Sequence, residues 1–107
     1  MEATTLMKMY ILVREAVPLG FAINAVGHAS LACFLKYASH RDMQNWLANS
    51  YKKVTCKVTD EELTAAMQAA DNHVVITESV IGHETIAVAF CPRKEWPESF
   101  GELKLYR

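Results

Sequence analysis

Short apolar runs alternate along this sequence with longer segments in which apolar residues recur at helical spacing. Residues 8–13 form a nearly continuous apolar run, which is typical of a strand buried on both faces. Three further segments are rich in β-branched residues and predict strands: 53–58, 73–77 and 85–90. A short loop that holds Gly82 joins the last two, and such a loop favours an antiparallel pair.

Two segments between the first two strands predict helices. Apolar residues recur on more than one side of 19–38, so we expect this helix to be covered over most of its circumference. Met43, Trp46 and Leu47 are spaced three or four residues apart, and they predict a shorter helix over 42–49.

The clearest local signal is Thr59, which precedes three acidic residues ending at Glu62. A threonine N-cap with glutamate at the third helical position forms a capping box, in which each residue bonds the main chain of the other. This pattern predicts a helix that begins after Thr59 and continues to about residue 70.

The order of these elements predicts an α/β fold, a three-layer α/β/α sandwich with a mixed four-stranded sheet. Right-handed crossovers make the first three strands parallel, and the hairpin turns the fourth strand back against them. The length of 107 residues suits a single domain over 1–107. Within it, we expect 1–7 to be a loose lead-in and 93–107 to be a tail docked on the sheet.

Charge is nearly balanced overall but uneven along the chain. The net charge is −1, which gives no reason to expect nucleic acid as a partner. Residues 36–57 nevertheless carry five basic side chains against one acid, and 58–102 carry nine acids against two basic side chains. Two solvated faces of opposite sign account for this pattern, and the alternative is that the basic stretch meets a polyanion.

Several classes of chemistry have no support in the sequence. The four His and three Cys match no zinc pattern, and nucleotide-binding motifs are missing, so we expect neither a metal nor a cofactor. Cys33, Cys56 and Cys91 are far apart, which favours buried, reduced thiols and a cytoplasmic protein. No apolar run reaches the roughly 18 residues expected of a membrane span, so we expect no membrane contact.

One edge of the predicted sheet gathers polar side chains. Ligands of open α/β sheets usually lie beyond the carboxyl ends of the parallel strands, and the first helix begins at the same edge. No Ser, Thr, Asp or Asn precedes that helix as a cap, which leaves its first amide groups free for an anion or a carbonyl oxygen. The residues expected to line this edge are Arg14, Gly20, Asn24, His28, Thr77, Glu78, Glu84 and Thr85.

Each of these residues also has a purely structural interpretation. His28 is a single histidine on a largely apolar helix, and such residues are more often hydrogen-bonded core residues than catalysts. Asn24 could cap a loop carbonyl, and Arg14 could form an ion pair with Glu78 across the end of the sheet.

The run Lys8-Met9-Tyr10-Ile11-Leu12-Val13-Arg14, a loop with Gly20, and then Gly27-His28-Ala29-Ser30-Leu31 resemble the opening of type II peptidyl-tRNA hydrolases. Residues 53–62 resemble that family's Lys-Val strand and acidic helix start, and 85–92 resemble its last strand. The similarity runs through residues 8–92 in order and spacing, and the succession of motifs carries it.

The resemblance implies roles for some residues but not for others. His28 matches the family's histidine, Glu78 stands in place of its Asp, and its Thr falls on Glu84 or Thr85. Three functional residues of the family have no counterpart, because its Lys falls on Phe21, its Gln on Ala25 and its Ser on Gly27. The chain is similar to an uncharacterised bacterial branch of this superfamily, which keeps the strand Arg and has an Asn at the position of Asn24.

Three functions follow as hypotheses. The first is hydrolysis of an acyl ester or amide, with His28 as general base or water-orienting group, Glu78 steering it, and the helix start stabilising an oxyanion. The second is a non-catalytic module that binds a small acyl or anionic ligand at the same edge. The third is a structural role in an oligomer held by the apolar tail, and the resemblance implies a homodimer. The resemblance also implies tRNA as a substrate, but the missing Lys and the absence of a basic surplus disfavour it.

Overall fold

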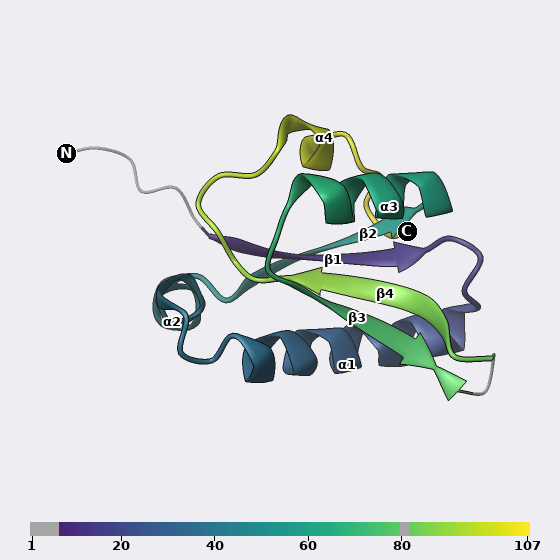
Figure 1. Cartoon of the computed structure of the whole chain (residues 1–107), viewed down its shortest axis with the longest axis horizontal. Coiled ribbons are helices and arrows are strands. Elements are labelled where there is room, and N and C mark those ends of the chain that lie inside the picture. Colours follow the sequence, from purple (N-terminus) through teal and green to yellow (C-terminus); the bar gives the residue numbers. More distant parts are fainter. Residues whose placement is uncertain (1–6, 80–81) are drawn as a thin grey trace.

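The computed structural model of the chain describes residues 7–79 and 82–107 (Figure 1). The lead-in expected over 1–7 therefore lies, apart from Met7, outside the described residues. The elements are β1 (Lys8–Arg14), α1 (Leu19–Lys36), α2 (Arg41–Asn49), β2 (Lys52–Val58), α3 (Asp60–Ala69), β3 (His73–Glu78), β4 (Glu84–Phe90) and α4 (Glu98–Gly101).

The four strands form one mixed sheet in the order β2-β1-β4-β3. β1 runs parallel to β2 and antiparallel to β4, and β4 is antiparallel to β3. The predicted directions are therefore confirmed, with β1, β2 and β3 running one way and β4 against them. Since β4 lies between β1 and β3, only β1 and β2 form a hydrogen-bonded parallel pair, and the sequence did not predict this insertion.

Helices cover both faces of the sheet, as expected for three layers. Figure 1 shows α1 and α2 on one side and α3 and α4 on the other. Side chains of β1 alternate between the two cores, because successive residues of a strand point to opposite faces. Met9, Ile11 and Val13 face α1 and α2, whereas Tyr10 and Leu12 face α3 and α4.

The capping box at the start of α3 is confirmed. Thr59 Oγ1 accepts a hydrogen bond from the Glu62 amide at 3.1 Å, and Glu62 Oε1 accepts one from the Thr59 amide at 2.8 Å. The start of α1 is different, because its N-cap is Pro18 and no side chain caps it. This difference also agrees with the sequence.

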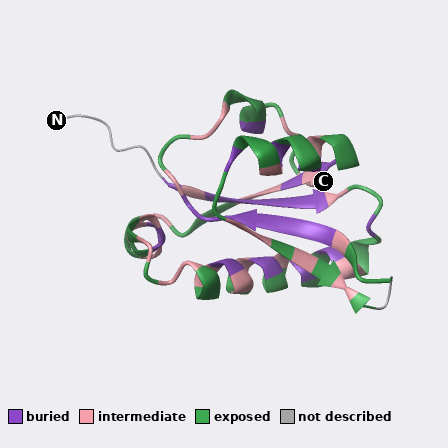
Figure 2. Cartoon of the chain, viewed as in Figure 1, coloured by how far each residue is buried: buried purple, intermediate pink, exposed green. Residues whose placement is uncertain are grey.

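The expectation that α1 is covered over most of its circumference is wrong. Only the side formed by Ala22, Ala25, Ala29 and Cys33 is buried on the sheet, and Figure 2 shows its remaining surface partly or fully exposed. Four large apolar side chains of this helix are 60–66% exposed: Leu19, Ile23, Leu31 and Leu35. The presence of apolar residues on several sides of the helix therefore did not indicate that all these sides are buried. No element among the described residues covers the exposed apolar side of α1.

The same helix bears on the expectation that the chain has no membrane-spanning segment. By length and composition alone, α1 is apolar enough to cross a membrane, although the sequence suggested no such run. In the structure, α1 packs one side against the sheet as a core helix.

The tail after β4 returns along the outer edge of β2. Phe100 is buried, and Trp96 and Leu103 pack against the same core. Leu105 then bridges to Cys56 in antiparallel fashion, with the Lys57 amide donating to Lys104 and the Tyr106 amide donating to Thr55. The aromatic side chains proposed as a subunit contact are thus largely used inside the fold.

Candidate functional site

Arg14, at the end of β1, is the centre of a network at the predicted edge. Its Nε donates to Asp60 Oδ1 at 2.7 Å, and its Nη1 donates to the carbonyl oxygen of Thr85 at 3.0 Å and to Glu84 Oε2 at 3.4 Å. Sequence analysis placed Arg14, Glu84 and Thr85 at one edge, and the structure brings them together. The guanidinium is therefore committed to protein partners and offers little to an anionic ligand.

Asp60 is the member of this network that sequence analysis did not select. The signal was present, because Asp60 comes two residues after the last residue of β2 and so falls near the carboxyl end of a strand. The hydrogen bond from Arg14 lowers the pKa of the Asp60 carboxyl and raises the pKa of the Arg14 guanidinium. Both shifts favour the charged pair, which is a structural clamp between β1, α3 and β4.

The first turn of α1 keeps free main-chain donors. The first main-chain hydrogen bond of the helix runs from Ala22 to Pro18. Because a helix leaves its first amides without internal partners, those of Leu19, Gly20 and Phe21 can meet an oxygen atom. A Cβ added at Gly20 would meet nothing within 4 Å, so the main chain is open to approach there.

Asn24 and His28 are both exposed on α1, and neither forms a hydrogen bond within the described part of the chain. His28 is therefore not a buried core histidine, and Asn24 caps no described carbonyl. Each lies two residues from Val26, a rotation of about 200° around a helix. Val26 faces the groove towards α2, so Asn24 and His28 point away from it, on the solvent-exposed side of the helix.

α1 packs beside β3. The Lys36 ammonium and the Tyr37 hydroxyl, at the end of α1, both donate to the carbonyl oxygen of His73, at 3.0 and 3.1 Å. β3 starts there and runs back along α1, so its last residue, Glu78, lies beside the N-terminal half of the helix (Figure 1). Asn24 lies in this half, and His28 lies at the middle of the helix.

The remaining predicted residues belong to the β3–β4 hairpin. Thr77 pairs with Thr85 and Glu78 with Glu84, after a register shift that follows the pairing of Ile76 with Ala87. The shift leaves Ile86 as an extra residue on β4, and Ile86 and Ala87 both join the core under α1. A bulge of this kind re-aims the side chains that follow it.

The length of α1 divides the predicted site in two. Nine residues separate Leu19 from His28, which corresponds to about 13 Å along the helix. A general base must lie within about 3 Å of the proton it takes, or act through one water. His28 and the free amides at the start of α1 are therefore better suited to two different groups of a substrate than to one carbonyl group, and the helix start as the oxyanion site for His28 stays a prediction.

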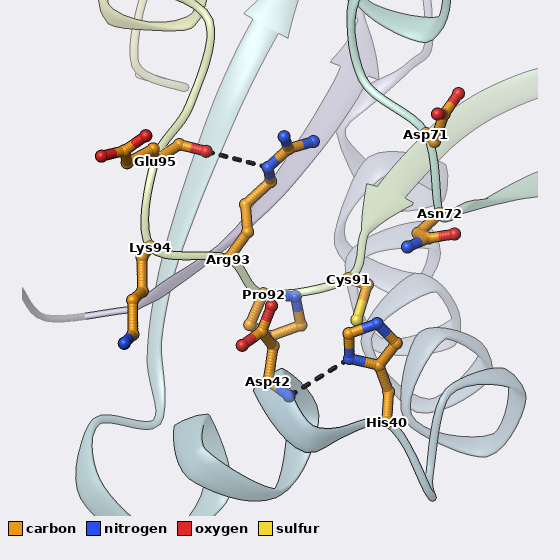
Figure 3. A pocket seen from close by; sticks show the side chains of 9 residues that line it. All are labelled: His40, Asp42, Asp71, Asn72, Cys91, Pro92, Arg93, Lys94 and Glu95. Atoms are coloured by element: carbon orange, nitrogen blue, oxygen red, sulfur yellow. Dashed lines mark hydrogen bonds between the residues drawn. The ribbon is translucent and has the colours of Figure 1, made fainter.

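A second hollow of about 470 Å³ lies at the opposite end of the sheet (Figure 3). It lies beyond the carboxyl end of β4, where Arg93 Nε donates to the Glu95 carbonyl at 2.8 Å and His40 Nδ1 accepts from the Asp42 amide at 3.1 Å. Burial raises the pKa of the Cys91 thiol to about 11, so this sulfur is not a nucleophile at neutral pH. The described residues form no cluster suited to a metal, and this hollow has no obvious chemistry.

Comparison with known proteins agrees with the fold. A search of curated proteins found no match. The family model described as Peptidyl-tRNA hydrolase PTH2 matches residues 7–106. Because this match covers nearly the whole sequence, the chain belongs to the Peptidyl-tRNA hydrolase PTH2 family.

Proposed function

We propose that this protein is a diverged hydrolase of the PTH2 family that cleaves an acyl ester or amide between α1 and the end of β3. The observation that carries the proposal is the exposure of Asn24 and His28 on α1, a helix that packs beside β3, the strand that ends at Glu78. Membership of a hydrolase family supports the reaction class, and the exposed imidazole supports the residue.

The proposed step is attack of water on the acyl carbon. His28 takes the proton of the water as the new carbon–oxygen bond forms, and it returns the proton to the leaving oxygen or nitrogen when the acyl bond breaks. Glu78 stabilises the imidazolium by its negative charge. Asn24, one helical turn before His28, donates its side-chain amide to the developing oxyanion.

The free amides at the start of α1 have a separate role in this proposal. They lie about 13 Å from His28, which suits a second polar group of the substrate, such as a carboxylate or a carbonyl oxygen. Gly20 lets the substrate approach the main chain closely. A substrate with one polar end group and a scissile acyl bond some distance away fits both positions.

Charge at this edge argues against a large polyanion as substrate. The residues that follow β1, β2 and β3 or precede β4 include six carboxylates, on Glu15, Asp60, Glu61, Glu62, Glu78 and Glu84. Arg14, the cation at the end of β1, is already paired, and Lys57, Lys104 and Arg107, which line a hollow with Glu15, do not outnumber these acids. The position of the family's Lys holds Phe21, which packs against the core under α1. A small acyl compound therefore fits this edge better than intact peptidyl-tRNA.

The test is hydrolysis by the purified full chain of N-acetyl amino acid esters and amides and of peptidyl-tRNA. We expect turnover of the small compounds, and a loss of about 10²–10³-fold in kcat/KM for His28→Ala. Glu78→Gln should lower kcat, whereas Glu61→Gln, a matched exposed acid at the same edge, should leave it unchanged. Equal rates for the wild type and His28→Ala, or no turnover at all, would contradict the proposal.

The second candidate is a non-catalytic module, which the replacement of the family's Lys by Phe21 favours. In that case N-acetyl amino acids stabilise the protein thermally without being hydrolysed, since a ligand that binds only the folded state raises its stability. Asn24→Ala would remove the thermal shift, and an unchanged shift would place the ligand elsewhere.

A further inference from the structure

A groove of about 550 Å³ lies between α1, α2 and the start of β2, away from the site described above. Its walls are mainly apolar, with Val26, Leu31 and Phe34 from α1 and Trp46 from α2. Leu31 is 60% exposed, whereas the apolar residues Val26, Phe34 and Trp46 beside it are partly or fully buried. Exposed apolar surface joined to a hollow is typical of a place where another molecule packs.

One end of the groove is closed by an unusual residue. Tyr51 has a φ of 61°, a left-handed conformation that favours glycine and is rare for a bulky side chain. It follows α2 in the position where glycine is the common choice. Its ring stacks on Trp46 at a centroid distance of 5.0 Å and 18° between planes, and 61% of the residue stays exposed. Such strain is typical of functional sites.

The groove continues into a cationic edge. Lys53 lines the groove, with its ammonium 4.3 Å from the centroid of the Tyr51 ring. Two further hollows follow along β2 and the tail; the first shares Lys53 with the groove, and the second shares Leu105 with the first. Their charged lining residues are six cations and one acid: Lys8, Lys52, Lys53, Lys57, Lys104, Arg107 and Glu15.

These cations are unneutralised in a chain whose net charge is −1. The ion pairs among the described residues involve Arg14 and none of the six. Six like charges on one edge attract an anionic partner and speed its association. The partner must therefore bring negative charge to β2 and apolar surface to the neighbouring groove.

Nucleic acid meets only the first requirement. Proteins that bind single strands offer free aromatic faces on which bases stack. Here the Tyr51 ring is engaged by Trp46 and Lys53, and the Tyr106 ring is engaged by the Lys57 ammonium at 4.5 Å. An apolar groove also has no complement in a phosphate backbone, whereas a polypeptide can supply both groups.

We infer that this groove and the edge of β2 bind an acidic polypeptide segment that carries an apolar anchor side chain. The anchor lies against Leu31, Phe34 and Trp46. Acidic side chains beside it meet Lys53 and Lys52. The nine acids of residues 58–102 lie within the folded domain and not in a free segment, so we assign the bound segment to another protein.

The experiment uses a fluorescein-labelled peptide in which leucines recur every third or fourth position among glutamates, and measures its anisotropy with the full chain. We expect saturable binding, lost when the glutamates are replaced by glutamine or the leucines by serine. Lys53→Gln should weaken binding about fivefold and Leu31→Ser about tenfold. Tyr51→Gly, whose backbone suits glycine, should keep the fold and weaken binding.

Matched controls separate this surface from the rest of the molecule. Leu35→Ser changes a similarly exposed leucine of α1, and Lys94→Gln changes an exposed lysine that lines none of the three hollows; neither should alter binding. Equal binding of the glutamate and glutamine peptides would overturn the inference, as would Leu31→Ser binding like the wild type. Tight binding of single-stranded RNA unaffected by Leu31→Ser, or dimerisation abolished by it, would assign the surface to RNA or a second copy instead.

Discussion

At the scale of single residues, the position of Arg14 could be predicted from the sequence, but its hydrogen-bond partners could not. Its place at the end of β1 could be predicted, because the apolar run before it defines the strand. Its partners could not, since the choice between Asp60, Glu78 and Glu84 depends on how α3 and β4 are placed around the strand end. The structure joins it to Asp60 and Glu84, which turns an expected ligand contact into a structural clamp.

The two tryptophans give a prediction at the same scale. Trp46 Nε1 donates to the carbonyl oxygen of Lys52 at 2.8 Å, whereas the buried Trp96 Nε1 has no acceptor among the described residues. Trp46→Phe leaves a carbonyl without its donor, and Trp96→Phe removes only an unpaired N–H. Trp46→Phe should therefore lower the free energy of unfolding by about 1–2 kcal/mol more than Trp96→Phe.

Urea denaturation of the two variants measures this difference. Both substitutions remove a similar volume from a packed aromatic side chain, so each is the control for the other. Equal losses would mean that the indole hydrogen bond of Trp46 contributes nothing to stability.

At the scale of elements, the sequence predicted most of the fold. β-branched alternation and the capping box located the strands and α3 to within one or two residues. The exposure of α1 was missed, because its apolar residues face several directions and periodicity alone does not say which directions have partners. The order of the strands was missed for a similar reason, since a short hairpin fixes that β3 and β4 pair but not that β4 enters the middle of the sheet.

The capping box gives the prediction at this scale. Thr59→Ala removes the side-chain oxygen that accepts from the Glu62 amide, and should lower the free energy of unfolding by about 1 kcal/mol. Glu62→Gln is the control, because glutamine can also accept from the amide of Thr59. Chemical denaturation followed by circular dichroism measures both, and equal losses would show that charge, not the hydrogen bonds, stabilises the start of α3.

At the scale of the whole molecule, the three free thiols couple stability to alkaline pH. Burial raises the pKa of Cys33 to about 12, and the pKa values of Cys56 and Cys91 to about 11. In the unfolded chain a thiol titrates near 8.5. Below that pH both states hold the proton and stability is fully present; above it the unfolded state loses the proton first, so stability falls until the folded thiols titrate.

We expect the free energy of unfolding to fall by up to about 1.4 kcal/mol per thiol for each pH unit above 9. Urea denaturation at pH 8, 9 and 10 measures the slope. Cys33→Ala should start less stable, because it leaves a cavity in the core, but should lose less stability as the pH rises. The same slope in the variant and the wild type would contradict the assignment to Cys33.

The position of β4 also governs how this protein can be made. Ile11 of β1 pairs with Ala89 of β4, and β3 has β4 as its partner in the sheet. Until residue 90 has emerged from the ribosome, β4 cannot form. During that time β1 lacks one of its two neighbouring strands, and β3 lacks its partner strand. Folding of the sheet therefore waits for the last strand, and the apolar β1 needs protection from aggregation during translation.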